Sequence, residues 1–472
     1  MGFGERIGDT LRVPGRGLRR FVTVLTVLVL AAGVGSAVSL TAPTLVADLG
    51  LTGAPAAEGP PAPVPALGPL AATAPTPTTA GLEAVLGPAV EDMPGRFAGT
   101  VVDPATGQVL WASDADRALV PGSTAKVLTA AAALLTLNPT DGFVTRVVAG
   151  TQPGTVVLVG GGDPTLTALP EGEDGVYPGP ARLDELVREV REKVPGPIDT
   201  VVVDTSRYSG PTSAPGWDPS DVAAGFVTPI EPLMLDGGRL DPTVQDTPRT
   251  SEPALEAGQV FAELLGADDV ETGTAPGEGE RLASVTSAPF SELVEHTMRT
   301  SDNVLAEALA REVAIARNGQ PSFAGAAEQT IGALTQAGFD PAGAVLVDGS
   351  GLSTDDEVPA RLLGTLLAAA ATPAEGERDT DFLRPLITGL PVAGGDGTLD
   401  DRFGIDAPSA PGRGTVRAKT GTLTNVSSLA GLVTDADGRL LVFAFMSNGA
   451  SPATVRPRLD AMAAELGGCG CR

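Results

Sequence analysis

The stretch VPGSTAKVLTAAAAL, residues 120–134, places one of the rarest residue types of this chain at the start of a predicted helix. The chain has 31 lysines and arginines together, and only three of them, Lys126, Lys193 and Lys419, are lysines. Where a fixed positive charge suffices, arginine serves, whereas a lysine can give up its proton. We therefore expect the lysine at 126 to take part in proton chemistry.

The residues around this lysine predict how it is used. The apolar run from Ser123 to about Leu137 predicts a helix that ends near Pro139. Positions i and i+3 lie on one face of a helix, so the hydroxyl of Ser123 and the amine of Lys126 should lie side by side. A serine becomes a good nucleophile when a neighbouring base takes its proton. Burial, a second cation and the positive end of a helix all lower the pKa of a lysine, which makes a free amine available as that base.

Two further motifs supply groups for the same site. Lys419, in KTGTL (419–423), provides a second, permanent cation, and Gly421 leaves an open strand edge along which a ligand can lie. The SDN motif, Ser301 to Asn303, interrupts a predicted helix. Its serine can relay a proton and its amide can hold a peptide group. Each motif alone is common, but their combination in this order indicates a nucleophilic site.

Composition excludes several other classes of function. The formal net charge of −27 argues against binding to nucleic acid, which requires a basic surface. His296 is the only histidine, so a Ser-His-Asp mechanism or a zinc site is disfavoured, and the residue is predicted to be a packing or surface group. We expect neither a metal nor an organic cofactor. Lys193 is predicted to be a surface charge at the end of a helix.

The N-terminal region predicts export. Residues 1–20 form a basic tail, and residues 21–40 contain no charge, which matches the length of a membrane-spanning helix. Small residues within 35–39 also permit cleavage by a signal peptidase, so an anchor and a removed signal peptide remain alternatives. Residues 41–80 are rich in Pro and Ala and predict an extended linker. The rest of the chain is expected outside the cytoplasm, in the cell envelope.

The remainder predicts an α/β (α+β) fold in which an antiparallel sheet flanked by helices is interrupted by an inserted, strand-rich domain. Strand-like runs flank the turn DPATG, and three more close the sequence before a helix over about 452–466. Helical periodicity covers residues 291–316, 325–338 and 360–372. The predicted parts are 81–141 and 285–466 for the main domain, 142–284 for the insertion and 467–472 for a tail.

The tail contains both cysteines of the chain, Cys469 and Cys471, in GGCGCR. The body is thus free of thiols, and disulfides are not expected to hold the fold together. A C-x-C pair could bind a metal or join two chains. We predict instead a frayed terminus.

The motifs resemble a known family. GSTAK (122–126), SDN and KTGTL are similar to the motif trio of the active-site serine enzymes that bind β-lactams. Longer blocks, such as DTSRYSGP (204–211) and VDGSGLS (347–353), resemble the D-alanyl-D-alanine carboxypeptidase/endopeptidase family, the class C low-molecular-mass penicillin-binding proteins. The resemblance covers residues from about 81 to 466. It implies a β-lactamase/transpeptidase-like domain that carries an insertion.

The resemblance also implies roles for single residues. Ser123 would be the nucleophile, Lys126 its base, and Ser301 a proton relay between Lys126 and Lys419. Asn303, Lys419, Thr420, Gly421 and Thr422 would bind the substrate, with the backbone N–H groups of Ser123 and Thr422 as the oxyanion hole. The substrates implied are peptidoglycan stem peptides, and β-lactams would acylate the same serine.

Two other functions share these motifs. A β-lactamase would hydrolyse its antibiotic ester quickly, and a non-catalytic penicillin-binding sensor or wall scaffold would form no adduct. The predicted insertion, linker and membrane segment favour a wall enzyme. The sequence leaves open whether that enzyme is a carboxypeptidase or an endopeptidase, because both cut the same kind of bond.

Overall fold

The computed structural model describes residues 73–372 and 380–472. The predicted basic tail, the apolar segment 21–40 and most of the linker lie outside the described residues. Within the described part of the chain, no helix has both the length and the apolar character needed to cross a bilayer.

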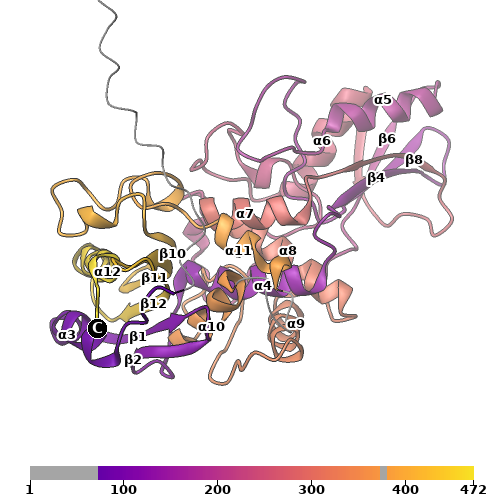
Figure 1. The fold of residues 1–472 in the computed structure, drawn as a ribbon. Helices are drawn as coiled ribbons and strands as arrows, with labels where there is room; N and C mark the ends of the chain where they lie inside the picture. The colour runs from indigo at the N-terminus through magenta and orange to yellow at the C-terminus, as the bar shows by residue number, and fades with distance from the viewer. Residues whose placement is uncertain (1–72, 373–379) are drawn as a thin grey trace, which may run out of the picture. The chain divides into compact units, whose positions relative to one another are not determined.

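The main sheet joins the two ends of the described chain. Its five antiparallel strands lie in the order β10-β11-β12-β1-β2, with β1 and β2 from the beginning and the other three from the end (Figure 1). Their bounds are β1 Arg96–Asp103, β2 Gln108–Ser113, β10 Arg417–Leu423, β11 Val426–Thr434 and β12 Leu440–Asn448. The hairpin predicted across DPATG and the three C-terminal strands are confirmed.

Helices cover both faces of this sheet, which explains why β12 is almost uniformly apolar. Its residues Leu441, Phe443 and Phe445 face one core, together with α3 (Thr79–Glu91) and α12 (Pro452–Gly468). The alternate residues, among them Ala444, face the other core, which the remaining helices cover (Figure 1). A strand buried on both faces loses the alternation of polar and apolar residues.

The helices on the second face carry the predicted SxxK and SDN motifs. They are α4 (Lys126–Thr136), preceded by the 3₁₀ turn η1 (Gly122–Ala125), then α7 (Phe290–Thr300), α8 (Asn303–Ala316), α9 (Phe323–Gln336) and α10 (Ala360–Ala371). A short helix, α11 (Pro385–Thr388), and a two-strand pair, β3 (Ala118–Leu119) with β9 (Val358–Pro359), complete this part. The predicted helices are confirmed, and the long one breaks at the SDN motif.

A second sheet is built from residues between the two halves of the first. Its strands lie in the order β7-β6-β5-β4-β8, with β5, β6 and β7 parallel and β4 antiparallel to both neighbours. The bounds are β4 Val144–Ala149, β5 Thr155–Val159, β6 Thr200–Asp204, β7 Asp269–Thr272 and β8 Arg281–Thr286, with helices α5 (Leu183–Lys193) and α6 (Pro253–Leu265). We propose that residues 142–284 are an insertion into the main domain.

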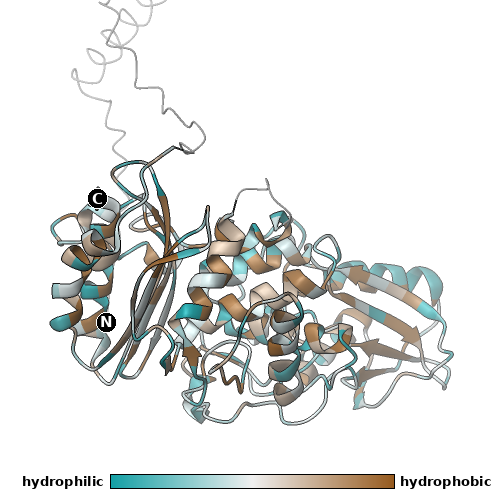
Figure 2. Cartoon of the chain, turned by 60° about the horizontal axis from the view of Figure 1, so that its bottom comes forward, coloured by the Kyte–Doolittle hydropathy of each residue, from teal (hydrophilic) through white to brown (hydrophobic). Residues whose placement is uncertain are grey.

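Helix α5 follows from an amphipathic pattern. Leu183, Leu186 and Val190 share its buried face, and most of the charged side chains lie on the opposite face, so α5 is largely teal in Figure 2. Lys193 ends this helix in an exposed setting and donates a hydrogen bond to the carbonyl of Arg281. The prediction of a surface charge at a helix end is confirmed.

The prediction of a frayed tail is wrong. Cys469 and Cys471 are joined by a disulfide, and both are buried against the core that contains α3 and α12. The backbone N–H of Thr78 donates to the carbonyl of Cys471 at 2.7 Å, which ties the tail to the start of α3. The tail is ordered because the two apolar half-cystines cover part of a core that would otherwise face water.

Candidate active site

Ser123 and Lys126 lie on the turn that leads into α4. Ser123 belongs to η1, and Lys126 is the first residue of α4, so the chain brings positions i and i+3 to one side. The Nζ atom of Lys126 lies 3.0 Å from the Oγ atom of Ser123. The contact predicted from the spacing is confirmed. Lys126 is fully buried, whereas Ser123 is half-buried and can meet a ligand.

The other contacts of Lys126 decide what its amine can do. Nζ donates to Oδ1 of Asn303 at 2.6 Å and to the carbonyl of Ser350 at 2.7 Å. These two oxygens can only accept hydrogen bonds, so a neutral amine donates both of its N–H groups to them. The remaining lone pair then faces the Ser123 hydroxyl. The geometry therefore suits Lys126 as the acceptor of the Ser123 proton.

The SDN motif forms a strained junction between two helices. Helix α7 ends at Thr300, and Ser301 adopts a left-handed conformation with φ of 63°. Asp302 caps α8 by accepting from the N–H of Leu305 at 2.9 Å. A non-glycine residue in this region costs on the order of 1–3 kcal/mol and persists only where its surroundings enforce it. The strain directs the Ser301 side chain toward β10.

The surroundings that enforce this junction come from loops that join the strands of the second sheet. The carboxylate of Asp302 is fully buried and accepts hydrogen bonds from Arg239 at 2.9 Å and from the hydroxyl of Tyr177 at 3.0 Å. Arg239, with Arg249 at 4.0 Å, lowers the pKa of Asp302 well below its usual range despite burial. Sequence reasoning missed these partners, because nothing in the spacing links 177, 239 and 302.

Lys419 joins the site from the far end of the chain. Its Nζ donates to Oγ of Ser301 at 2.8 Å and to the carbonyl of Thr420 at 3.0 Å. We expected Ser301 to bridge the two lysines. The structure instead bonds Ser301 to Lys419 and gives Asn303 the contact with Lys126. The amide of Asn303 is oriented by its Nδ2, which donates to the carbonyl of Phe226 at 2.9 Å.

The electrostatics of the two lysines differ from the expectation in one respect. Burial lowers the pKa of Lys126 to about 8, although Asp348 and Glu307 oppose the shift. Burial, followed by the charge of Lys126, lowers the pKa of Lys419 well below its usual value. Two buried lysines at close range disfavour each other's charge, so the electrostatics of the site oppose the predicted permanent charge of Lys419. An anionic ligand at Lys419 would favour its charged form.

The open edge of β10 faces the serine. The N–H of Ala418 on that edge donates to the carbonyl of Pro391, and alternation along a strand turns the N–H of Thr422 toward the same edge. A side chain at Gly421 would come within 2.4 Å of the Pro121 carbonyl and 3.1 Å of the Ser123 nitrogen. The close approach of β10 to η1 thus requires glycine at 421, and the role of this glycine in opening the edge to a ligand stays a prediction.

Comparison with known proteins agrees with the family that the motifs resemble. The model of the D-Ala-D-Ala carboxypeptidase 3 (S13) family matches residues 79–250 and 245–466. The chain belongs to this family. It is a serine-type D-Ala-D-Ala carboxypeptidase, as the resemblance predicted.

Individual relatives span nearly the whole described chain. Carboxypeptidase Rv3627c of Mycobacterium tuberculosis is 48% identical over 409 residues, which cover 85% of this chain and 87% of the relative. Carboxypeptidase DacB of Mycolicibacterium smegmatis is 45% identical over 422 residues, or 87% and 90% of the two chains. Penicillin binding protein 4 from Haemophilus influenzae has a similar fold, with a TM-score of 0.65 at 22% identity over 80% of this chain and 97% of that one. The predicted fold class is confirmed.

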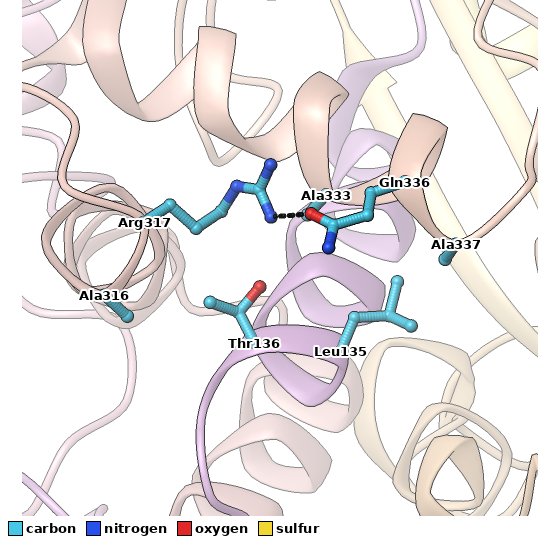
Figure 3. A pocket seen from close by; sticks show the side chains of 7 residues that line it. All are labelled: Leu135, Thr136, Ala316, Arg317, Ala333, Gln336 and Ala337. Atoms are coloured by element: carbon cyan, nitrogen blue, oxygen red, sulfur yellow. Dashed lines mark hydrogen bonds between the residues drawn. The ribbon is translucent and has the colours of Figure 1, made fainter.

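Two other features of this family member do not belong to the site. A pocket of about 570 Å³ lies at the far end of α4, between α8 and α9, where Arg317 donates to Gln336 at 2.9 Å (Figure 3). Its α4 lining residues are Leu135 and Thr136, more than two turns beyond Lys126. His296 packs against the ring of Tyr177, with centroids 5.4 Å apart, and burial lowers its pKa to about 4. Its predicted packing role is confirmed.

Proposed function

We propose that Ser123 is the nucleophile of this carboxypeptidase and that Lys126 is its general base. The observation that carries the proposal is the set of three contacts at Nζ of Lys126, two of which are to oxygens that cannot donate. A positioned base of this kind contributes roughly 10²–10⁴-fold to the rate. Attack of Ser123 on the carbonyl of the penultimate D-Ala gives an acyl ester, which water then hydrolyses.

The remaining motif residues have distinct roles in the proposal. Ser301, with Lys419 behind it, returns a proton to the departing amine. Lys419 and Thr420 receive the free carboxylate of the terminal D-Ala, a charge-assisted contact that selects chain ends. Asn303 holds the substrate amide in place of its present bond to the Phe226 carbonyl. The N–H groups of Ser123 and Thr422 form the oxyanion hole, where each donor contributes about 3 kcal/mol to catalysis.

The substrates in this proposal are peptidoglycan stem peptides, or D-amino-acid cross-links for an endopeptidase. β-Lactams present a carboxylate and a strained amide at the same spacing, so they acylate Ser123. The Haemophilus influenzae protein of similar fold has been solved in complex with a β-lactam. We further propose that the chain acts outside the cytoplasm, either anchored through residues 21–40 or released after cleavage.

The test is acylation of Ser123 by benzylpenicillin, followed by mass spectrometry of the intact protein and of its peptides. The wild type should gain one penicilloyl group at Ser123. Lys126→Arg keeps the charge but cannot accept a proton, so acylation should fall by about a thousandfold. Lys193→Arg, the same exchange at the end of α5, should react like the wild type. Normal acylation of Lys126→Arg would refute the role of Lys126.

The same preparation separates the rival functions. Rapid consumption of penicillin without a lasting adduct would indicate a β-lactamase. No adduct with either penicillin or a stem pentapeptide would indicate a sensor or wall scaffold. Digestion of pentapeptide and of cross-linked muropeptides in parallel would divide carboxypeptidase from endopeptidase activity.

A further inference from the structure

The loop that supplies the carbonyl for Lys126 is held from the same helix as Lys126 itself. Residues 347–353, VDGSGLS, lie between α9 and β9, and the carbonyl of Ser350 accepts from Nζ of Lys126. The neighbouring carbonyl, that of Gly349, accepts from the hydroxyl of Thr129 at 2.6 Å. Thr129 lies one turn beyond Lys126 on α4. Two consecutive carbonyls of the loop, those of Gly349 and Ser350, are thus held along α4.

A buried carboxylate on α8 holds the same loop at the peptide group before Gly349. Both oxygens of Glu307 accept from the N–H of Gly349, at 2.9 and 3.0 Å. Glu307 is fully buried and lies four residues after Asn303, so the two share one face of α8. Helix α8 therefore contributes one acceptor to Lys126 directly, Asn303, and contacts the loop of the other acceptor at the N–H of Gly349, one residue before Ser350.

Other groups fold the same loop without touching this peptide N–H. Asp348 accepts from the N–H groups of Ser350, Gly351 and Ser353 and from the indole of Trp217 at 2.8 Å. Asp356 accepts from the N–H of Val347 at 2.7 Å. Asp348 and Asp356 thus shape the loop from within the segment that joins α9 to β9, and Asp348 binds the N–H of the peptide group whose carbonyl Lys126 uses. Glu307 is the carboxylate that reaches the loop from α8.

Glu307 also belongs to the set of charges that face Lys126. Carboxylates raise the pKa of Lys126 against burial from three places: Asp348 and Asp356 around the 347–353 loop, Glu307 within α8 and Asp302 at its start. Lys419 on β10 is the lysine on the other side, and burial, followed by the charge of Lys126, lowers its own pKa. Behind Glu307 lies Arg311, whose NH1 is 3.8 Å from the carboxylate, also buried. Burial, with Asp348, raises the pKa of Glu307 to about 7, so it ionises just below the range in which Lys126 titrates.

We propose that Glu307 is a positioning residue for Lys126, which holds the Ser350 carbonyl in place and sets the proton affinity of the amine. The inference rests on the proposed function, since it requires Lys126 to accept the Ser123 proton. With Ser350 and Asn303 both fixed, the lone pair of a neutral Lys126 has one direction left, toward Ser123. The ionised Glu307 carboxylate at the same time keeps the amine basic enough to take a proton.

The charge is tested by Glu307→Gln, which keeps an acceptor for the Gly349 N–H and removes the negative charge. The rate of penicillin acylation at Ser123 is measured from pH 5.5 to 10, a range chosen to span about two units on either side of Lys126 titration. The rising limb should move to lower pH by about one unit, because an opposing charge at this range shifts a pKa by about that much or more. The control is Glu312→Gln on the same helix, a buried carboxylate that is paired with Arg207. Its limb should coincide with that of the wild type.

The geometry is tested by Thr129→Val, which removes the hydroxyl from the Gly349 carbonyl without changing any charge. Acylation should slow by about tenfold with its pH midpoint unchanged, because the acceptor moves but the charges do not. A wild-type rate in Thr129→Val, or a wild-type midpoint in Glu307→Gln, would overturn the proposal even if stability falls. Failure of the wild type to form an adduct would instead overturn the proposed function.

Discussion

At the residue scale, the site depends on a lysine whose pKa is lowered by burial. Lys126 is enclosed by α4, α8 and the 347–353 loop, and desolvation brings its pKa to about 8. Because lysine is rare in this sequence, each lysine was a candidate for a chemical role. The structure places Lys126 and Lys419 in one site and leaves Lys193 at the surface. The charge state of Lys419 could not be predicted, because it depends on the distance between two residues almost 300 positions apart in the sequence.

The buried ion pair between Arg239 and Asp302 gives a stability prediction at this scale. Arg239→Met leaves the Asp302 carboxylate without its nearest cation and should lower the free energy of unfolding by about 3 kcal/mol at pH 7. Arg361→Met, which breaks a surface pair with Asp116, is the control and should have a much smaller effect. Both are measured by urea denaturation.

The pH dependence of this difference follows from the depressed pKa of Asp302. A carboxyl whose pKa is lowered in the folded state adds stability above the pKa it has when unfolded, about 3.9, and loses it as the pH falls below that value. The gap between wild type and Arg239→Met should therefore narrow below about pH 4. A gap that stays constant from pH 7 to pH 3 would show that the lost stability is not electrostatic.

At the scale of elements, the site forms where a strand edge meets the turn before a helix. β10 is an edge strand of the main sheet, and η1 lies against it with Gly122 and Gly421 at the contact. The sequence predicted β10, α4 and the break in the long helix, because each has a local pattern of apolar residues or caps. The 347–353 loop was noticed only as a family block, since a loop that works through its carbonyls leaves no side-chain signature.

The strand contact gives a prediction about Gly421. Gly421→Ala would place a methyl group 2.2 Å from the hydroxyl of Ser428 and 2.4 Å from the Pro121 carbonyl, so β10 must move away from η1. A displacement of about 1 Å at the oxyanion hole should slow penicillin acylation by about a hundredfold. Gly468→Ala, at the end of α12 with open space around it, is the matched control and should acylate at the wild-type rate. Equal rates for the two variants would contradict the assigned role of the β10 edge.

At the scale of the whole molecule, the two ends of the chain complete each other. β1 pairs with β12, from Arg96 opposite Asn448 to Val102 opposite Val442, and α12 packs beside α3 under the same sheet. The site shares this arrangement, because Ser123 comes from the first half and Ser301 and Lys419 from the second. Folding of the main domain therefore requires both ends of the described chain.

The ordered C-terminus gives the prediction at this scale. Deletion of residues 469–472 uncovers the core around α3 and removes the bond from Thr78 to Cys471, which should lower the free energy of unfolding by about 2 kcal/mol. Arg472→Ala removes only a surface ion pair with Asp437 and should leave the free energy of unfolding unchanged. A deletion variant with the wild-type free energy of unfolding would show that the tail does not stabilise the core.

Sequence patterns alone were enough to predict the type of catalytic site and most of the helices and strands. The three motifs, the scarcity of lysine and the single histidine defined a serine site with an amine base, because such chemistry restricts residue types and spacing over a few positions. The hydrogen bonds and ion pairs that orient these groups became visible only in the folded chain. The Asn303 and Ser350 acceptors of Lys126, the Glu307 carboxylate behind them and the Arg239 partner of Asp302 are joined across long sequence separations. Such contacts depend on how helices and loops pack, and packing is a property of the folded chain that no local pattern encodes.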